Sequence, residues 1–230
     1  MYLMKNPRNF DGGGNDAYTV LLINCDGVDA STTFTDTSVG GTTHTITVEA
    51  DAQVDTAQKK FGTGSAYYTT TADGMTIPDS SDFAFGSGNF TIDFWARFDD
   101  KTVNSSGLFA QRVDTANRHY CFFDISGTLY WKILSSAGNL INVNVAFDPT
   151  LNQWYHFAFV RNGNNFNLYI DGTSVINTSS ASAYPDFAAD FLIGSITGTT
   201  RMNGWLDEIR ISKGIARWKS DFTPPTKAYY

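Results

Sequence analysis

The chain has 230 residues, of which 42% are hydrophobic and 15% aromatic, and its formal net charge at pH 7 is −7. A chain of this length can form one large β domain, and its many Ser, Thr, Asn and Gly residues disfavour long helices. The negative charge argues against nucleic acid or an anionic membrane surface as a partner, because either would require a basic face on the protein.

The first 18 residues differ in composition from the rest of the chain. Lys5 and Arg8 flank Pro7, and the glycine-rich run DGGGND follows. Such runs are flexible, so residues 1–18 are predicted to form an extended N-terminal arm that is either disordered or docked on another subunit. The chain has no apolar run of the length that a signal peptide or a membrane span needs, so we expect synthesis in a cytoplasm and no membrane insertion.

Short strand patterns separated by turn residues fill the remainder of the chain. In FTIDFWARF, apolar residues occupy every second position from Ile92 onward, which is the period of a half-buried strand. Asn162-Gly163 and Asp171-Gly172 are hairpin turn dipeptides that divide WYHFAFVRNGNNFNLYIDGTSVINT into three strands. We therefore predict one antiparallel β-sandwich over residues 19–226, followed by a C-terminal tail, 227–230, that leaves the domain.

The cysteines and histidines of the chain indicate neither a disulfide framework nor a zinc site. Cys25 and Cys121 each lie in an apolar, strand-like run, so we expect small buried hydrophobic residues instead of a bridge. The three histidines have no shared spacing and no cysteine partners, which is unlike the ligand pattern of zinc.

The last strand pattern, GWLDEIRIS, contains an acid at an unexpected position. Regular alternation would place Asp207 on the same face as Ile209 and Ile211. A buried carboxylate is costly unless it is paired or hydrogen-bonded, so Asp207 needs compensation. Three kinds remain open: backbone amides, a basic side chain and a divalent cation.

A set of segments spread over most of residues 20–226 carries a family resemblance. They are LLINCDGVDASTTFTDTS, AQKKFGTGSAYY, IPDSSDFAFGSGNFTIDFWARF, QWYHFAFVRNGNNFNLYIDG, FLIGS and GWLDEIRISKGIARWKSDFTPP. In this order they resemble the laminin-G-like branch of the concanavalin A-like lectin/glucanase superfamily, which is abundant in bacteriophage and bacterial surface proteins. The resemblance implies an all-β jelly-roll sandwich of two curved antiparallel sheets, with the first and last strands close together.

The carboxylates do not form the pair that a glycosidase needs. In the glucanase branch of the family that the chain resembles, the acid and the nucleophile are glutamates a few residues apart on one strand. This chain has only Glu49 and Glu208, in distant segments. Asp207 and Glu208 are adjacent and so face opposite sides of a regular strand. We therefore expect no catalytic residue and no enzymatic activity.

The resemblance also bears on the opening between the terminal strands. Several jelly-roll sandwiches hold a structural calcium ion there, with ligands from an early loop and a late aspartate. Asp26 and Asp207 occupy these positions here, and Asp29 and Asp36 lie near the first of them. Carboxylate oxygens are the ligands that calcium prefers. We expect Asp26 and Asp207 to help close the sandwich, with or without one Ca²⁺, and expect no other cofactor.

Aromatic residues and asparagines are the candidates for ligand binding, because sugar sites combine an aromatic platform with hydrogen-bonding amides. Tyr130 and Trp131 are adjacent, so one of them should face outward. Asn142 and Asn144 alternate with apolar residues and should line an exposed sheet face. Two further tyrosines complete the predicted set, one opposite the buried face of its strand and one in a loop: Tyr169 and Tyr184.

Two functions of different classes fit these features. The first is a non-catalytic virion surface protein, such as a bacteriophage head or tail appendage or decoration, whose lectin-like domain binds glycans or the host surface. The second is a purely structural assembly subunit with no sugar binding, and a glycoside hydrolase fits less well. Both place the chain on a virion and use the N-terminal arm to contact other virion subunits, and self-association is left open.

Overall fold

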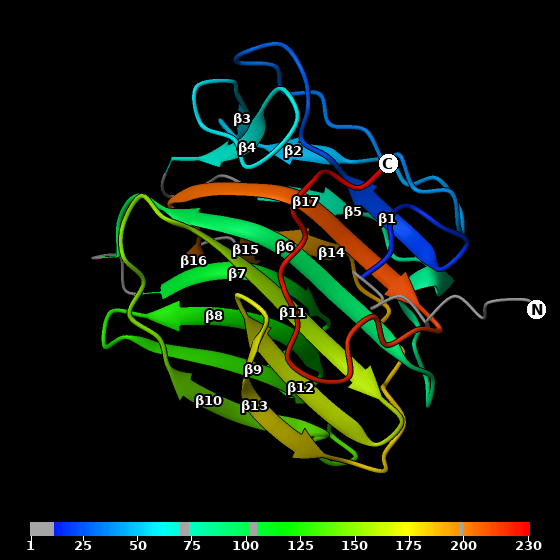
Figure 1. Ribbon diagram of the computed structural model, residues 1–230. Coiled ribbons are helices and arrows are strands. Elements are labelled where there is room, and N and C mark those ends of the chain that lie inside the picture. Colours follow the sequence, from blue (N-terminus) through cyan, green and yellow to red (C-terminus); the bar gives the residue numbers. More distant parts are fainter. Residues whose placement is uncertain (1–11, 70–73, 102–104, 198–199) are drawn as a thin grey trace, which may run out of the picture.

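Two antiparallel sheets packed face to face form the domain (Figure 1), which confirms the predicted all-β jelly-roll sandwich. The computed structural model describes residues 12–69, 74–101, 105–197 and 200–230. Within these ranges the one helical element is the short 3₁₀ turn η1 (Ser81–Phe83). No described helix is therefore long and apolar enough to cross a membrane.

Sheet A has eight strands, in the order β13-β12-β11-β6-β17-β4-β3, with β1 also paired to β17. Their bounds are β1 (Thr19–Ile23), β3 (Gln53–Asp55), β4 (Ser65–Tyr68), β6 (Phe90–Phe98), β11 (Trp154–Asn162), β12 (Asn165–Ile170), β13 (Thr173–Ser179) and β17 (Gly204–Lys213). The first and last strands are therefore hydrogen-bonded neighbours, as the resemblance implies.

Sheet B has seven strands, in the order β10-β9-β8-β7-β14-β5-β2. Their bounds are β2 (Thr47–Glu49), β5 (Gly74–Ile77), β7 (Ser105–Arg112), β8 (Arg118–Asp124), β9 (Thr128–Leu134), β10 (Ile141–Ala146) and β14 (Phe191–Ile193). A separate two-stranded hairpin lies against β7: β15 (Ser195–Thr197) and β16 (Thr200–Arg201).

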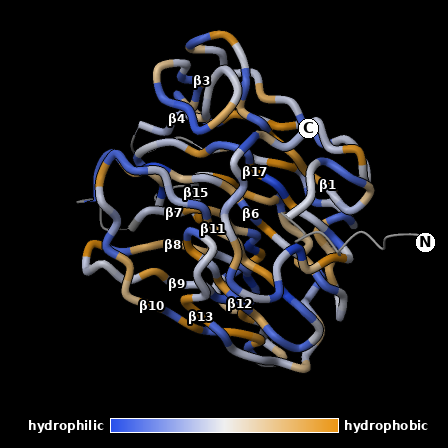
Figure 2. Tube along the Cα trace, in the orientation of Figure 1, coloured by the Kyte–Doolittle hydropathy of each residue, from blue (hydrophilic) through white to orange (hydrophobic). Residues whose placement is uncertain are grey.

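Aromatic side chains fill the space between the sheets. Phe94 of β6 stacks on Phe157 and Phe159 of β11, at centroid distances of 5.6 and 5.9 Å. Rings of this size bury a large apolar area. Figure 2 shows that apolar residues are spread along the strands of both sheets. Cys25 and Cys121 are both free and buried, which confirms their predicted role as small core residues.

The chain after β17 crosses the outer face of sheet A instead of leaving the domain. In Figure 1 this segment, drawn in red, runs in front of β11, β6 and β17. Trp218 and Phe222 stack on each other at 4.2 Å and cover the sheet. Ala228 and Tyr229 are buried at the far end of the segment. The predicted tail, 227–230, is thus part of the domain, because the side chains of Ala228 and Tyr229 are buried against it.

Residues 12–16, predicted to be part of the flexible N-terminal arm, are held by two buried arginines. Arg210 Nη1 donates to two backbone carbonyls of this segment at 2.8 and 3.1 Å. Arg217 donates to a third carbonyl at 2.9 Å and to Asp16 at 2.8 Å. The folded domain therefore includes residues 12–18, while residues 1–11 of the predicted arm lie outside the described residues.

The last strand does not alternate regularly, because β17 has a β-bulge at Asp207 and Glu208. Asp207 lies opposite Trp95 of β6, but the next paired residue is Arg210, opposite Asp93, and Glu208 has a φ of 51°. An inserted residue shifts the alternation by one. Asp207 therefore lies on the outer face of sheet A, and the prediction that it shares a face with the two isoleucines is wrong.

Candidate functional site

The outer face of sheet B carries a strip of aromatic side chains on two neighbouring strands. Cys121 of β8 and Trp131 of β9 are fully buried between the sheets. Because successive strand residues point to opposite faces, their neighbours in both strands point outward. We call the three outward rings the aromatic strip: Tyr120, Phe122 and Tyr130.

The rings of the aromatic strip are stacked nearly parallel. The centroids of Tyr120 and Phe122 are 5.6 Å apart with an interplanar angle of 14°. Those of Phe122 and Tyr130, which lie opposite each other on β8 and β9, are 4.7 Å apart with an angle of 11°. Phe122 and Tyr130 are partly exposed. Rings stacked this closely cover one another's faces, so together they present a strip of apolar ring edges, an apolar platform against which the C–H groups of a sugar can pack.

Charged and amide groups surround this platform. The Arg118 guanidinium lies 4.6 Å from the ring centroid of Tyr120, and Lys132 Nζ lies 4.9 Å from the ring centroid of Tyr130. Asn142 and Asn144 of β10 are exposed, and they lie opposite Lys132 and Tyr130 in the β9–β10 register. Amides both donate and accept hydrogen bonds, so the face can bind ligand hydroxyl groups beside an apolar platform.

Asp124 connects the aromatic strip to a hollow at the β8–β9 turn. The Tyr130 hydroxyl donates to Asp124 at 3.1 Å, and the other oxygen of that carboxylate accepts from Ser126. A hollow of about 740 Å³ follows, lined by Asp124 together with Lys101 and Asp148, among others. Because Asp124 contacts Tyr130 of the aromatic strip and also lines the hollow, a ligand on the strip can extend into the hollow.

The hairpin of β15 and β16 borders the aromatic strip on its other side. Gly107 of β7 lies opposite Phe122. A Cβ atom at Gly107 would lie 2.6 Å from the carbonyl oxygen of Thr200 and 2.7 Å from the backbone nitrogen of Ile196. Only glycine permits this close approach, so the hairpin packs directly beside the rings.

Three of the six predicted ligand-binding residues lie together on this face: Tyr130, Asn142 and Asn144. Sequence reasoning missed four others, on β8 and β9, namely Arg118, Tyr120, Phe122 and Lys132. The signal was present in RHYCFFD. If Cys121 is buried, as expected, the alternation of the strand places its neighbours Tyr120 and Phe122 on the outward face.

Trp131 and Tyr184 are not part of the face, because both are buried in the core around His119. Trp131 Nε1 donates to His119 Nε2 at 2.8 Å, and the Tyr184 hydroxyl lies 2.8 Å from His119 Nδ1. Burial lowers the pKa of His119 to about 3, so the ring is neutral and its Nε2 can accept this bond. Trp131 and Tyr184 therefore serve as hydrogen-bond partners of the buried His119 and cannot contact a ligand.

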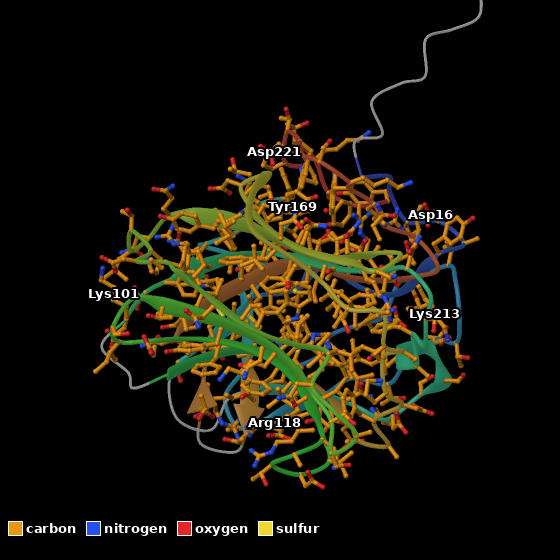
Figure 3. The ribbon with its side chains drawn as sticks, turned by 90° about the horizontal axis from the view of Figure 1, so that it is seen from below. Asp16, Lys101, Arg118, Tyr169, Lys213 and Asp221 are labelled. Atoms are coloured by element: carbon orange, nitrogen blue, oxygen red, sulfur yellow. The ribbon has the colours of Figure 1, made fainter. Side chains whose placement is uncertain are left out.

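Tyr169 lies on the other side of the sandwich and is also covered. Figure 3 shows it near Asp221, on the opposite side from Arg118. Its side chain is 1% exposed, and its ring packs on Phe222 at 5.3 Å. The expectation of an exposed ring fails because the C-terminal segment covers the face that alternation alone would leave in solvent.

Asp207 and Asp26 both hold the loop between β3 and β4. Asp207 Oδ2 accepts from the backbone amides of Lys60 and Phe61 at 2.7 and 3.0 Å. Its Oδ1 accepts the amide of the next residue in β17 at 2.8 Å. Asp26 accepts backbone amides from residues 63–64 of the same loop. Of the three kinds of compensation left open for Asp207, the structure shows backbone amides.

These carboxylates do not fit a calcium ion. Both oxygens of Asp207 already accept N–H groups. Asp29 and Asp36 also accept backbone amides. Within the described ranges, no group of three or more His, Cys, Asp or Glu side chains could hold a metal ion.

Solved structures share this fold at low sequence identity. Domain 4 of AbnA, a GH43 extracellular arabinanase from Geobacillus stearothermophilus, aligns with a TM-score of 0.66 and 19% identity over 87% of this chain and 94% of that one. The receptor-binding domain of the botulinum neurotoxin C/D mosaic serotype aligns with a TM-score of 0.66 and 14% identity over 87% and 49%. The binding domain of botulinum neurotoxin DC in complex with SialylT gives 0.65 and 15% over 88% and 50%. This chain thus spans about half of each toxin domain, and the likeness shows the fold alone.

Sequence comparison identifies the family. No curated protein matches this sequence. The family model described as "Concanavalin A-like lectin/glucanases superfamily" matches residues 69–217, a stretch that contains all strands from β5 to β17. The chain therefore belongs to the concanavalin A-like lectin/glucanase superfamily.

Proposed function

We propose that this chain is a non-catalytic glycan-binding module and that the aromatic strip on sheet B is its binding face. The observation that carries the proposal is the stack of Phe122 on Tyr130, with Lys132 over Tyr130 and the exposed Asn144 opposite it. Parallel rings supply an apolar platform, and the amide and ammonium groups supply the hydrogen bonds that sugar hydroxyls need.

Two similar structures support glycans as the class of ligand. The AbnA domain was solved in complex with arabinotriose, and the binding domain of botulinum neurotoxin DC was solved in complex with SialylT. Because one fold hosts many functions, the support comes from the fold together with the aromatic strip and not from the fold alone.

The positions of the glutamates support the non-catalytic part of the proposal. A retaining glycosidase holds two carboxyl groups about 5–5.5 Å apart around the scissile bond. Glu208 is buried under the C-terminal segment, where it accepts from Asn24 and from the backbone of Tyr229. Glu49 belongs to sheet B and pairs with Arg201 at 3.4 Å. The two glutamates therefore lie in different sheets, and neither belongs to the aromatic strip.

A glycan array probed with the full chain tests the proposal, followed by titration calorimetry with the glycan that binds best. We expect Tyr130→Ala and Phe122→Ala to weaken binding by about tenfold or more, because each removes part of the platform. Tyr18→Ala is the matched control, since Tyr18 is 48% exposed and lies outside the strip.

Several outcomes would contradict this function. They are an array without hits at high avidity, or a Tyr130→Ala variant that binds as tightly as the parent chain. Release of reducing sugar from any member of a broad polysaccharide panel would overturn the non-catalytic part alone.

We propose further that the chain is displayed on the surface of a bacteriophage particle. The support is the resemblance of its sequence segments to the laminin-G-like domains of bacteriophage and bacterial surface proteins. Mass spectrometry of purified particles tests its presence, and deletion of residues 1–11 tests whether they attach it. A chain absent from the particles contradicts this location, whereas incorporation without any glycan binding favours the purely structural decoration subunit.

A further inference from the structure

Strand β10 is an edge of sheet B and carries no charge. Its sequence is INVNVA, and the stretch from Ser135 to Phe147 contains no Asp, Glu, Lys or Arg. One side of β10 pairs with β9, and no described strand pairs with its other side. Edge strands in natural proteins are usually protected by charges, proline or a covering loop, because an open edge pairs readily with another strand.

The free side of β10 presents a regular row of backbone groups. The Phe147 amide donates to the Gly127 carbonyl at 2.7 Å, which identifies these two residues as a hydrogen-bonded pair of the β9–β10 ladder. Hydrogen-bonded and non-hydrogen-bonded pairs alternate along an antiparallel ladder. The backbone N–H and C=O groups of Asn142, Asn144 and Ala146 therefore point away from β9, and no backbone bond from another described segment reaches them.

The edges at the other end of the sandwich are protected. In β3, the amide and carbonyl of Val54 bond to Ser31 and Ala30 of a covering loop, each at 2.8 Å, and the strand ends at Asp55. At the far edge of sheet B, β2 has three residues and ends at Glu49. Both described edges there carry an acid and are short, so the open side of β10 is not a general property of the fold.

We propose that β10 pairs antiparallel with β10 of a second copy of this chain, about a twofold axis at Asn144. If the twofold axis is perpendicular to the sheet, the outer faces of both copies lie on the same side of the joined sheet. Two residues that pair across the axis must therefore have side chains on the same face. Placing Asn144 opposite Asn144 of the second copy meets this condition and also sets Asn142 opposite Ala146. The same register brings the free backbone groups of the two strands together.

The inner face of the strand supports this partner. In the register centred on Asn144, Val143 lies opposite Val145 of the second copy. Both valines pack on the core but are only partly buried in one chain, so pairing removes apolar surface from water. Each chain has a net charge of −7, and an uncharged edge lets two such chains approach without local repulsion. The neighbouring edge strand of sheet A, β13, lies against β10 and is also uncharged (Figure 1).

Pairing joins the two candidate binding faces. The row Phe122, Tyr130, Asn144 in one copy continues into Asn144, Tyr130 and Phe122 of the other. At about 4.8 Å between strands, the two Tyr130 backbones lie about 14 Å apart on one surface. A single glycan chain can then contact both aromatic strips, and binding to the second strip becomes intramolecular, which raises the avidity. This consequence rests on the proposed glycan function, but the pairing itself does not.

The mass of the full chain in solution, measured without glycan by sedimentation equilibrium, tests the pairing. We expect twice the chain mass of 25.3 kDa. Asn144→Lys places two like charges at the axis and should give the mass of one chain. Thr47→Lys, on the opposite edge of sheet B, is the matched control and should remain dimeric. Circular dichroism checks that each variant is folded.

A cysteine pair tests the register. Residues in a hydrogen-bonded antiparallel pair have Cα atoms about 5.5 Å apart, which a disulfide can span. Under oxidising conditions Asn144→Cys should form a covalent dimer, whereas Asn142→Cys, which faces Ala146 of the second copy, should not.

Four results would overturn this inference: a parent chain that remains at 25.3 kDa, open-ended larger assemblies, a dimeric Asn144→Lys variant, and equal cross-linking of the two cysteine variants. Because no glycan is present in these experiments, failure here leaves the Tyr130→Ala test of the binding face unaffected.

Discussion

The hydroxyl of Tyr229 donates a hydrogen bond of 2.6 Å to Oδ2 of Asp93, which lies 136 residues earlier in the chain. Asp93 also accepts from Nε and Nη2 of Arg210 at 3.0 and 3.1 Å, and all three side chains are buried. Burial by itself would raise the pKa of Asp93, but Arg210 and His156 together lower it to about 2. An ionised and well-partnered carboxylate therefore ties the C-terminal segment to the outer face of sheet A.

Tyr229→Phe should lower the free energy of unfolding by about 1.5–3 kcal/mol, because it removes a hydrogen bond to a charged group. Asp93→Asn should cost more, about 3–5 kcal/mol, because Arg210 then remains buried without a counter-charge. Urea denaturation at pH 7 measures both changes. Tyr230→Phe is the control, since Tyr230 is 80% exposed. Equal stability of the Tyr229→Phe and Tyr230→Phe variants would show that the buried bond does not anchor the segment.

Asp207→Ala should lower the free energy of unfolding by about 3 kcal/mol or more, because three buried amides lose their acceptor. Asp207→Asn keeps one carbonyl oxygen for the loop amides of Lys60 and Phe61, so its loss should be smaller. Urea denaturation gives the order of the two variants, and faster amide exchange at Phe61 locates the effect. An Asn variant that is less stable than the Ala variant would contradict this role of Asp207.

Removal of divalent cations should leave the thermal unfolding midpoint unchanged. The reason is that both oxygens of Asp207, one of the two predicted calcium ligands, already accept hydrogen bonds from backbone N–H groups. Melts of the same protein in chelator and in excess calcium chloride make the comparison. A midpoint that falls in chelator and recovers with calcium would restore the calcium alternative.

The bulge residue Glu208 should make stability depend on pH. Burial raises its pKa in the folded chain to about 7, from an ordinary value of 4.5. Between these two values the folded chain keeps a proton that the unfolded chain has lost, so the contribution of Glu208 is full below pH 4.5 and declines as the pH rises to 7. The free energy of unfolding of Glu208→Gln, relative to the parent chain, should therefore increase by about 2–3 kcal/mol across this window.

Urea titrations at several pH values between 4.5 and 7.5 measure this difference. Glu49→Gln provides the comparison, because it is the other Glu→Gln change available in the chain and its side chain is 44% exposed. A difference between Glu208→Gln and the parent chain that is constant over the whole range would contradict the raised pKa of Glu208.

Local sequence patterns were sufficient for the strands and for part of the binding face. Alternation in β6 and the dipeptides at residues 162–163 and 171–172 predicted the strands and hairpins that the structure contains. The same alternation in β10 placed Asn142 and Asn144 on an exposed face. These features depend only on which face a residue points to within its own strand, and a period-2 pattern carries that information.

Which outward face remains exposed depends on segments far away in the sequence. Tyr130 and Tyr169 both point away from the core of their sheets, but Phe222 packs on Tyr169 over sheet A, whereas Tyr130 on sheet B remains partly exposed. Alternation cannot distinguish the two tyrosines, because the covering segment follows the last strand and its docking is a tertiary contact.

The sequence by itself determined the all-β class, the strand periodicity and the family, because these arise from local alternation, turn residues and ordered motifs. Only the tertiary structure decided the position of Asp207, since a bulge shifts the register of β17 by one residue and so moves the carboxylate to the outer face. The docking of residues 214–230 was equally beyond local patterns, because it depends on a buried charge network that joins Asp93, Arg210 and Tyr229 across the whole chain.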